Sequence, residues 1–211
     1  MNTATIACPL IASVVSLSLA ATPDQRALDL LQRMTLEEKV GQLVQFSDGQ
    51  ATGPDRVKVD QTALLERGGI GSLLNAVGAH KTNALQKIAV EKSRLGVPLL
   101  FGLDVIHGYR TTFPVPLGLS AAWDPSLIER TARVAAAEAA AGGIRWTFAP
   151  MVDIARDPRW GRIMEGSGED PYLGSALAVA AVRGYQGGIG TANLAQPTSI
   201  LACAKHFVAY G

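Results

Sequence analysis

Short apolar segments alternate with segments of helical character along this chain, and this alternation constrains the fold more than any other feature. The clearest apolar segments are residues 70–74, 98–104, 145–152 and 199–204. They are continuous apolar runs, which is typical of parallel strands that are covered on both faces. Because helical segments separate them, the sequence favours βαβ units and predicts an α/β fold on a parallel sheet.

Local signals place the helices. Thr35 and Glu38 form a capping box, which predicts a helix from there to about residue 43. The pairs Asp124-Pro125 and Asp170-Pro171 each supply an N-cap followed by a proline in the first turn, so helices are predicted over 126–141 and 170–186. Two more helices are expected at 59–67 and 81–95. A short apolar piece is expected at 43–46, and a loop at 187–197.

Charged residues follow three of the expected strands. Asp104 and Asp153 each end one strand, and Lys205 and His206 follow the last. Because the carboxyl ends of parallel strands meet at one face, we expect these side chains to converge, together with Arg162 from the loop after Asp153. A carboxylate accepts hydroxyl protons while Arg and Lys donate to oxygens, so such a cluster suits a neutral ligand rich in hydroxyls.

Simpler roles for the same residues stay open. Asp104 could cap a turn at Gly108, and Arg162 could anchor its own loop by pairing with Asp157 or Glu165. Asp153, Asp157 and Arg159 are interpreted as shaping the loop rather than performing chemistry.

The histidines and cysteines show no ligand-motif spacing. A metal site formed by His107, His206 and Asp104 is a weaker interpretation than a buried His107 bonded to a loop carbonyl, so no metal is expected. Cys203 has apolar neighbours and is expected to be a small buried residue. No dinucleotide or phosphate-loop motif follows a strand, and no cofactor is expected.

Composition and the N-terminus limit the partners and the location. The 19 basic and 18 acidic residues nearly cancel, and no basic stripe is visible, so nucleic-acid binding is not expected. The first 21 residues carry no charged side chain, and small residues at Ser18 and Ala20 precede Ala21. We interpret residues 1–20 as a signal peptide, too short to span a membrane, of an exported, periplasmic or secreted protein; a buried N-terminal helix is the alternative.

Five sequence blocks, in the same order and spacing, resemble glycoside hydrolase family 3, and in particular its periplasmic β-glucosidases from bacteria. The blocks are Phe101–Gly108, Phe113-Pro114, Ala149–Arg162, Gly168–Tyr172 and Lys205–Phe207. The resemblance runs from about residue 34 to residue 211.

The resemblance implies a partial (β/α)8 TIM-type barrel with about five of the eight strands, residues 21–211 being the incomplete N-terminal part of the barrel domain. It also implies a retaining, exo-acting β-glycosidase that removes sugars from the non-reducing ends of β-glucosides or oligosaccharides. By the same resemblance, Asp104, Arg162, Lys205 and His206 would hold the hydroxyls of the sugar in the −1 subsite.

The catalytic pair of the family has no counterpart in these 211 residues. In the family, the nucleophilic Asp lies on a later strand and the acid/base Glu usually comes from the following domain. The chain alone is therefore expected to be inactive and to need the C-terminal portion of the same polypeptide as its partner. The alternatives are β-xylosidase specificity, a non-catalytic sugar-binding segment and, more weakly, a metal-dependent barrel hydrolase.

Overall fold

The structure, a computed structural model, describes residues 22–48, 60–207 and 210, and the chain divides into two compact units, residues 1–33 and 34–211. In the first unit, α1 (Pro23–Arg33) begins where the Thr22 hydroxyl accepts a hydrogen bond from the Gln25 amide at 3.2 Å. No residue of α1 is buried. The expected signal peptide, residues 1–20, lies outside the described residues.

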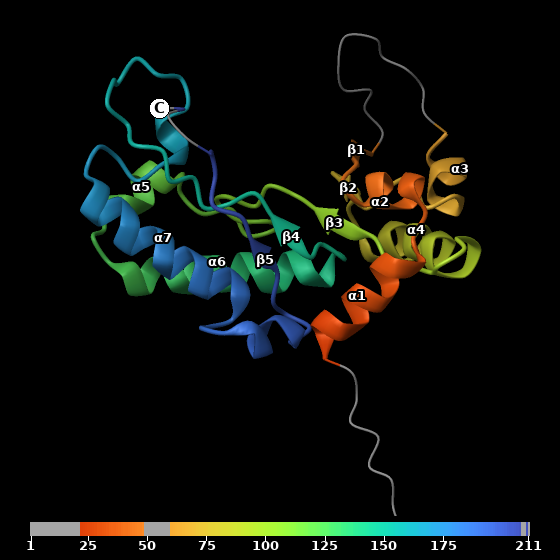
Figure 1. The fold of residues 1–211 in the computed structure, drawn as a ribbon. Coiled ribbons are helices and arrows are strands. Elements are labelled where there is room, and N and C mark those ends of the chain that lie inside the picture. The colour runs from red at the N-terminus through yellow and green to blue at the C-terminus, as the bar shows by residue number, and fades with distance from the viewer. Residues whose placement is uncertain (1–21, 49–59, 208–209, 211) are drawn as a thin grey trace, which may run out of the picture. The chain divides into compact units, whose positions relative to one another are not determined.

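The second unit is built on a parallel sheet of five strands in chain order (Figure 1). The strands are β1 (Gln45–Ser47), β2 (Ser72–Leu74), β3 (Leu100–Gly102), β4 (Trp146–Thr147) and β5 (Leu201–Ala202). At least one helix lies between each strand and the next in the chain. This is the order of the first five units of a (β/α)8 barrel, and it confirms the predicted fold class.

The helices are α2 (Leu36–Gln42), α3 (Gln61–Glu66), α4 (Ala79–Lys92), α5 (Pro116–Ser120), α6 (Pro125–Ala141) and α7 (Pro171–Gln186), with two 3₁₀ helices, η1 (Ile163–Glu165) and η2 (Thr191–Ala195). The capping box of Thr35 and Glu38 is present, and Asp124 and Asp170 each cap a helix as predicted. Four elements were not predicted: α1, α5, η1, and η2 within the expected loop.

The predicted strand over residues 145–152 is wrong in its length. The ladder of β4 covers Trp146 and Thr147 alone. Pro150 has no N–H to donate and cannot continue a ladder. Pairing resumes one residue later, as an isolated bridge between Met151 and Lys205.

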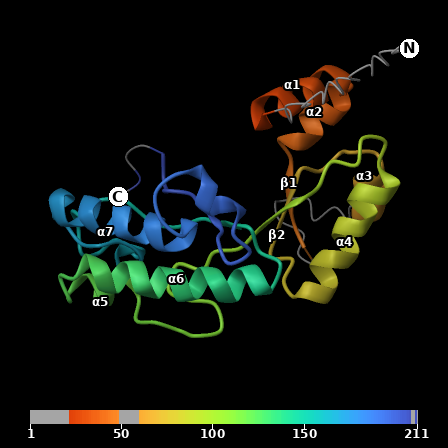
Figure 2. The same cartoon turned by 90° about the horizontal axis from the view of Figure 1, so that it is seen from below.

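The core lies between the sheet and its helices. The largest fully buried side chains include Leu73 of β2, Ile144 before β4 and Ile200 before β5. Helices α6 and α7 pack against each other and lie side by side in both views (Figures 1 and 2). Their contact is lined mainly by small residues, so their backbones approach closely: a Cβ added at Gly184 of α7 would lie 2.4 Å from the Glu129 carbonyl oxygen of α6.

Candidate functional site

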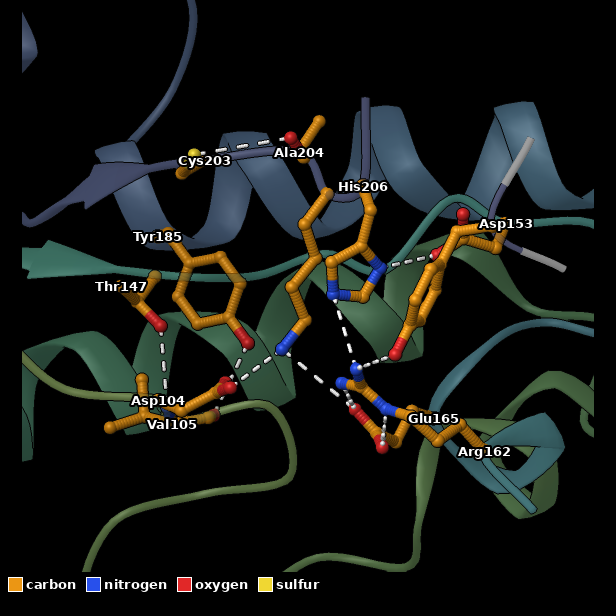
Figure 3. Close-up of polar contacts among 12 residues, drawn as sticks. Asp104, Val105, Thr147, Asp153, Arg162, Glu165, Tyr185, Cys203, Ala204 and His206 are labelled. Carbon is orange, nitrogen blue, oxygen red and sulfur yellow. Dashed lines mark hydrogen bonds and ion pairs between the residues drawn. The ribbon is translucent and has the colours of Figure 1, made fainter. Parts of the chain in front are cut away.

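Lys205 and Asp104 meet at the carboxyl end of the sheet. Asp104 follows β3 and Lys205 follows β5, and the Lys205 Nζ lies 2.6 Å from the Asp104 Oδ2 (Figure 3). The Lys205 side chain is 11% exposed, whereas that of Asp104 is 43% exposed. The ion pair therefore presents a carboxylate to solvent and keeps its ammonium partner largely enclosed.

Arg162 and Glu165 form a two-bonded ion pair across η1. The Arg162 Nε and Nη2 donate to the two Glu165 carboxylate oxygens, each at 2.6 Å. These bonds to Arg162 hold the pKa of Glu165 below its ordinary value, and the carboxylate in turn raises the pKa of Arg162. Glu165 Oε2 also lies 3.8 Å from the Lys205 Nζ, so one carboxylate lies between two cations.

His206 lies between a carboxylate and a guanidinium. Its Nδ1 is 2.7 Å from the Asp153 Oδ2, and its Nε2 is 3.3 Å from the Arg162 Nη1 (Figure 3). The Asp153 side chain is 4% exposed, against 28% for His206. The imidazole thus joins a buried acid to the open part of the cluster.

Aromatic rings lie beside the charged groups. The Tyr210 hydroxyl accepts a hydrogen bond from the Arg162 Nη1 at 3.1 Å, and the guanidinium carbon lies 5.4 Å from the Tyr210 ring centroid. The Tyr210 ring is also 4.4 Å from His206 and 5.7 Å from Trp160, centroid to centroid. Flat apolar rings beside hydrogen-bonding groups suit a ligand with both apolar faces and polar edges.

Two buried side chains fix the backbone where Asp104 enters the site. The Val105 amide donates to the Thr147 Oγ1 at 3.2 Å, and the Tyr185 hydroxyl donates to the Val105 carbonyl at 3.3 Å. Burial, and then the nearby charge of Asp104, raise the pKa of Tyr185, so this hydroxyl stays a donor. Asp104 therefore extends from a segment held at both its N–H and its carbonyl.

The structure brings together the five residues predicted to converge: Asp104, Asp153, Arg162, Lys205 and His206. The anchoring of Arg162 left open above is also present, through Glu165, whereas Asp157 pairs with Arg159 instead. Asp104 does not cap the turn at Gly108, whose amide donates to the Val105 carbonyl.

Two sequence interpretations are wrong. His107 is exposed rather than buried, and it lines a largely apolar pocket next to the site together with Ile106 and Tyr185. Cys203 is partly exposed rather than buried.

Within the described ranges, no group of three or more His, Cys, Asp and Glu side chains is placed to hold a metal ion. In the same ranges, no helix has both the length and the apolar character needed to cross a bilayer.

Sequence reasoning gave Glu165 only as one of two alternative partners of Arg162, and it missed the bond between Asp153 and His206. The i, i+3 spacing of Arg162 and Glu165 was a usable signal for their pairing. No local signal connects Asp153 with His206, since 53 positions separate them in the chain.

Known relatives share this segment. The chain is 41% identical over 193 residues to a periplasmic β-glucosidase of Salmonella typhimurium, covering 90% of this chain and 24% of that protein. It is 36% identical over 205 residues to a putative β-xylosidase of Formosa agariphila, covering 90% of this chain and 27% of the relative. The chain thus spans about a quarter of the length of these relatives.

Solved structures of β-glucosidases superpose on this chain. A β-glucosidase from Listeria innocua in complex with isofagomine superposes with a TM-score of 0.78 at 41% identity, covering 88% of this chain and 26% of that one. Residues 35–211 match the family described as the glycosyl hydrolase family 3 N terminal domain. With most of its length in that match, the chain belongs to glycosyl hydrolase family 3.

Proposed function

We propose that this chain provides the sugar-binding face of a retaining, exo-acting β-glycosidase of the β-glucosidase type. In this proposal, Asp104, Arg162, Lys205 and His206 hold the hydroxyls of the non-reducing-end sugar. The observation that carries it is the convergence of these four side chains at the carboxyl end of one sheet, where barrel enzymes bind their substrates.

The ion pairs within the site explain how a cluster of charged side chains can be stable before a neutral ligand binds. Buried or half-buried charges are costly unless they are paired. Here Lys205 is paired with Asp104, and Arg162 with Glu165, at hydrogen-bonding distances. A sugar hydroxyl can accept from Lys205 while donating to Asp104, because one hydroxyl does both. The sugar thereby joins existing contacts and leaves no charge unpaired.

We assign no catalytic residue to this chain. A retaining glycosidase needs two carboxyl groups about 5–5.5 Å apart, one as nucleophile and one as acid and then base. The nearby carboxylates Asp104, Glu165 and Asp153 are each engaged by a cation or a histidine. The nucleophilic Asp and the acid/base Glu are therefore proposed to come from residues other than these 211, and the chain alone is proposed to be inactive.

The activity test uses the purified chain and a nitrophenyl β-glucoside. The proposal expects no release of nitrophenol above the buffer rate, together with measurable binding of glucose. Release of nitrophenol that is lost in Asp104→Asn would place the catalytic pair within this chain and overturn its inactivity. A chain that neither binds glucose nor cleaves the glucoside would remove the proposed sugar site itself.

The names of the relatives are also compatible with a site that binds xylose. One is named a putative β-xylosidase, and another, from Dickeya chrysanthemi, a periplasmic β-glucosidase/β-xylosidase. Titration of the chain with glucose and with xylose decides between them. Tighter binding of glucose supports the β-glucosidase assignment, and tighter binding of xylose replaces it with β-xylosidase.

Export is part of the proposal. The charge-free start of the chain supports a signal peptide over residues 1–20, and the Salmonella relative is named periplasmic. Expression in a bacterial host followed by mass spectrometry is expected to find a mature N-terminus at Ala21 in the periplasmic fraction. An intact Met1 on cytoplasmic protein would contradict export.

A further inference from the structure

The two neighbours of His206 impose opposite demands on its two ring nitrogens. An arginine guanidinium has donors and no acceptor, whereas an ionised carboxylate has acceptors and no donor. Arg162 faces the Nε2 at 3.3 Å, and Asp153 faces the Nδ1 at 2.7 Å. The neutral ring satisfies both neighbours in one form alone, with the proton on Nδ1 and a lone pair on Nε2.

We infer that Asp153 is a positioning residue that fixes His206 in the Nδ1–H tautomer and aims the lone pair of Nε2 into the site. The Asp153 side chain is 4% exposed, so it does not reach the solvent-exposed part of the cluster. It acts through the imidazole, as a buried carboxylate orients a histidine in other enzyme sites.

The backbone around Asp153 holds it in register with His206. The Val152 amide donates to the Lys205 carbonyl at 2.7 Å, and the Lys205 amide donates to the Pro150 carbonyl at 3.0 Å. These two bonds flank the bridge between Met151 and Lys205. Both Asp153 and His206 therefore lie one or two residues beyond a paired segment, which leaves their side chains little freedom to separate.

Among the residues that the structure describes, the other groups around the ring do not compete for Nδ1. The Tyr210 ring lies 4.4 Å from the imidazole, centroid to centroid, and its hydroxyl bonds to Arg162. Glu165 accepts from Arg162 and lies close to Lys205, and Lys205 donates to Asp104. Glu165 and Lys205 therefore have partners other than the ring. Asp153 is the carboxylate bonded to the ring.

The tautomer has a consequence for recognition, and this step rests on the proposed function. With one lone pair on Nε2, a sugar hydroxyl that reaches His206 must donate its proton to that nitrogen and take the place of the Arg162 Nη1 donor. Lys205, by contrast, can only donate to a hydroxyl oxygen. The adjacent pair Lys205 and His206 thus offers one donor and one acceptor. An analogue with fluorine in place of the hydroxyl at His206 would lose that bond, because fluorine cannot donate.

The direct test is a long-range nitrogen–proton correlation spectrum of the imidazole rings of the purified chain at neutral pH, which distinguishes protonated from unprotonated ring nitrogens. The chain has three histidines, so the variant His206→Gln assigns the signal. The inference expects a protonated Nδ1 and an unprotonated Nε2 in the wild-type protein, without any ligand. A protonated Nε2, or a ring that exchanges between both forms, would overturn it.

Variants then identify Asp153 as the cause. Asp153→Ala is expected to abolish the preference for Nδ1–H, and Asp157→Asn is the matched control. Asp157 lies in the same loop and pairs with Arg159, so its loss is expected to leave the His206 signal unchanged. A wild-type signal in folded Asp153→Ala would show that Asp153 does not set the tautomer. Because the spectrum needs no sugar, a failure of glucose binding leaves this test intact.

Discussion

At the scale of single residues, the enclosed ammonium of Lys205 holds the site together. Its Nζ lies 2.6 Å from Asp104 and 3.8 Å from Glu165, and its side chain is 11% exposed. A lysine so placed draws together two carboxylates that would otherwise repel. It is also placed to donate to a ligand that approaches the half-exposed Asp104.

Replacing Lys205 by methionine is expected to weaken glucose binding at least tenfold. A hydrogen bond from a charged group contributes about 1.5–3 kcal/mol, and about 1.4 kcal/mol is tenfold in affinity. Calorimetric titration measures the effect. Lys87→Met is the control, because Lys87 is an exposed lysine of α4 that pairs with Glu91 on the same helix. Equal affinities of Lys205→Met and the wild type would exclude Lys205 from the binding site.

Acid should loosen the cluster through Glu165. Its bonds to Arg162 keep the pKa of Glu165 below the ordinary value of 4.5. A lowered folded pKa means that the unfolded chain binds this proton more tightly, so the stabilisation is fully present above the ordinary pKa and is lost as the pH falls through the folded one. The free energy of unfolding, from urea titrations at several pH values, is therefore expected to fall more steeply below about pH 4.5 in the wild type than in Glu165→Gln. If the free energy of unfolding falls with pH equally steeply in the wild type and in Glu165→Gln, this contribution of Glu165 to stability is contradicted.

The site residues differ in how far the sequence could predict them. Asp104, Lys205 and His206 follow apolar strands, and strand ends in a parallel sheet have only one face on which to meet. Asp153 was predicted to shape its loop, yet it also bonds to His206. Its partner is set by the pairing of two distant segments, which no short-range pattern encodes.

At the scale of elements, the packing of α6 against α7 depends on Gly184. A Cβ at this position would lie 2.4 Å from a backbone oxygen and 2.6 Å from the Ala132 Cβ. Gly184→Ala is therefore expected to destabilise the fold by about 1–3 kcal/mol, the usual cost of overpacking.

Gly174 on the same helix provides the matched control. A Cβ there would meet nothing within 4 Å. Gly174→Ala is thus expected to leave stability unchanged or raise it by up to about 1 kcal/mol through helix propensity. Urea titrations of both variants measure the difference. Equal effects of the two substitutions would refute close packing at Gly184.

Helix starts were predictable and the length of β4 was not. Asp124 and Asp170 signal their helices through a local N-cap and the proline that follows. In β4, an apolar run was taken for a ladder, although Pro150 within it cannot donate a backbone hydrogen bond. Helix α5 was missed because prolines and a glycine in residues 114–118 are typical of loops.

At the scale of the whole molecule, the order of the sheet has a consequence for association. Among the described residues, β1 pairs only with β2, and β5 only with β4. Unpaired strand edges are templates for pairing between chains. We propose that further strands of the polypeptide cover these edges in a complete barrel.

The isolated chain is accordingly expected to self-associate as its concentration rises, and a charge on the edge should reduce this. Leu201 of β5 is 37% exposed, so Leu201→Lys is the test variant, and Val90→Lys on α4 is the control. Sedimentation velocity over a range of concentrations measures the association. A wild-type chain that stays monomeric throughout would contradict the role of the open edge.

The alternation of strands and helices was enough to predict a parallel sheet. The barrel order was predicted from the family resemblance, because a doubly wound sheet shows the same alternation with another strand order. The sequence could also predict the face on which the charges gather. It could not predict which charges pair, since this depends on distances of a few ångströms between loops.

The central claim is that the cluster of Asp104, Arg162, Lys205 and His206 binds a sugar. Its most direct test is a glucose titration of the purified chain, followed by the imidazole signals of its three histidines. The account predicts a saturable shift of the His206 signal and no shift of His80, which is exposed on α4. A His206 signal that does not move at saturating glucose, or that moves no more than His80, would contradict it.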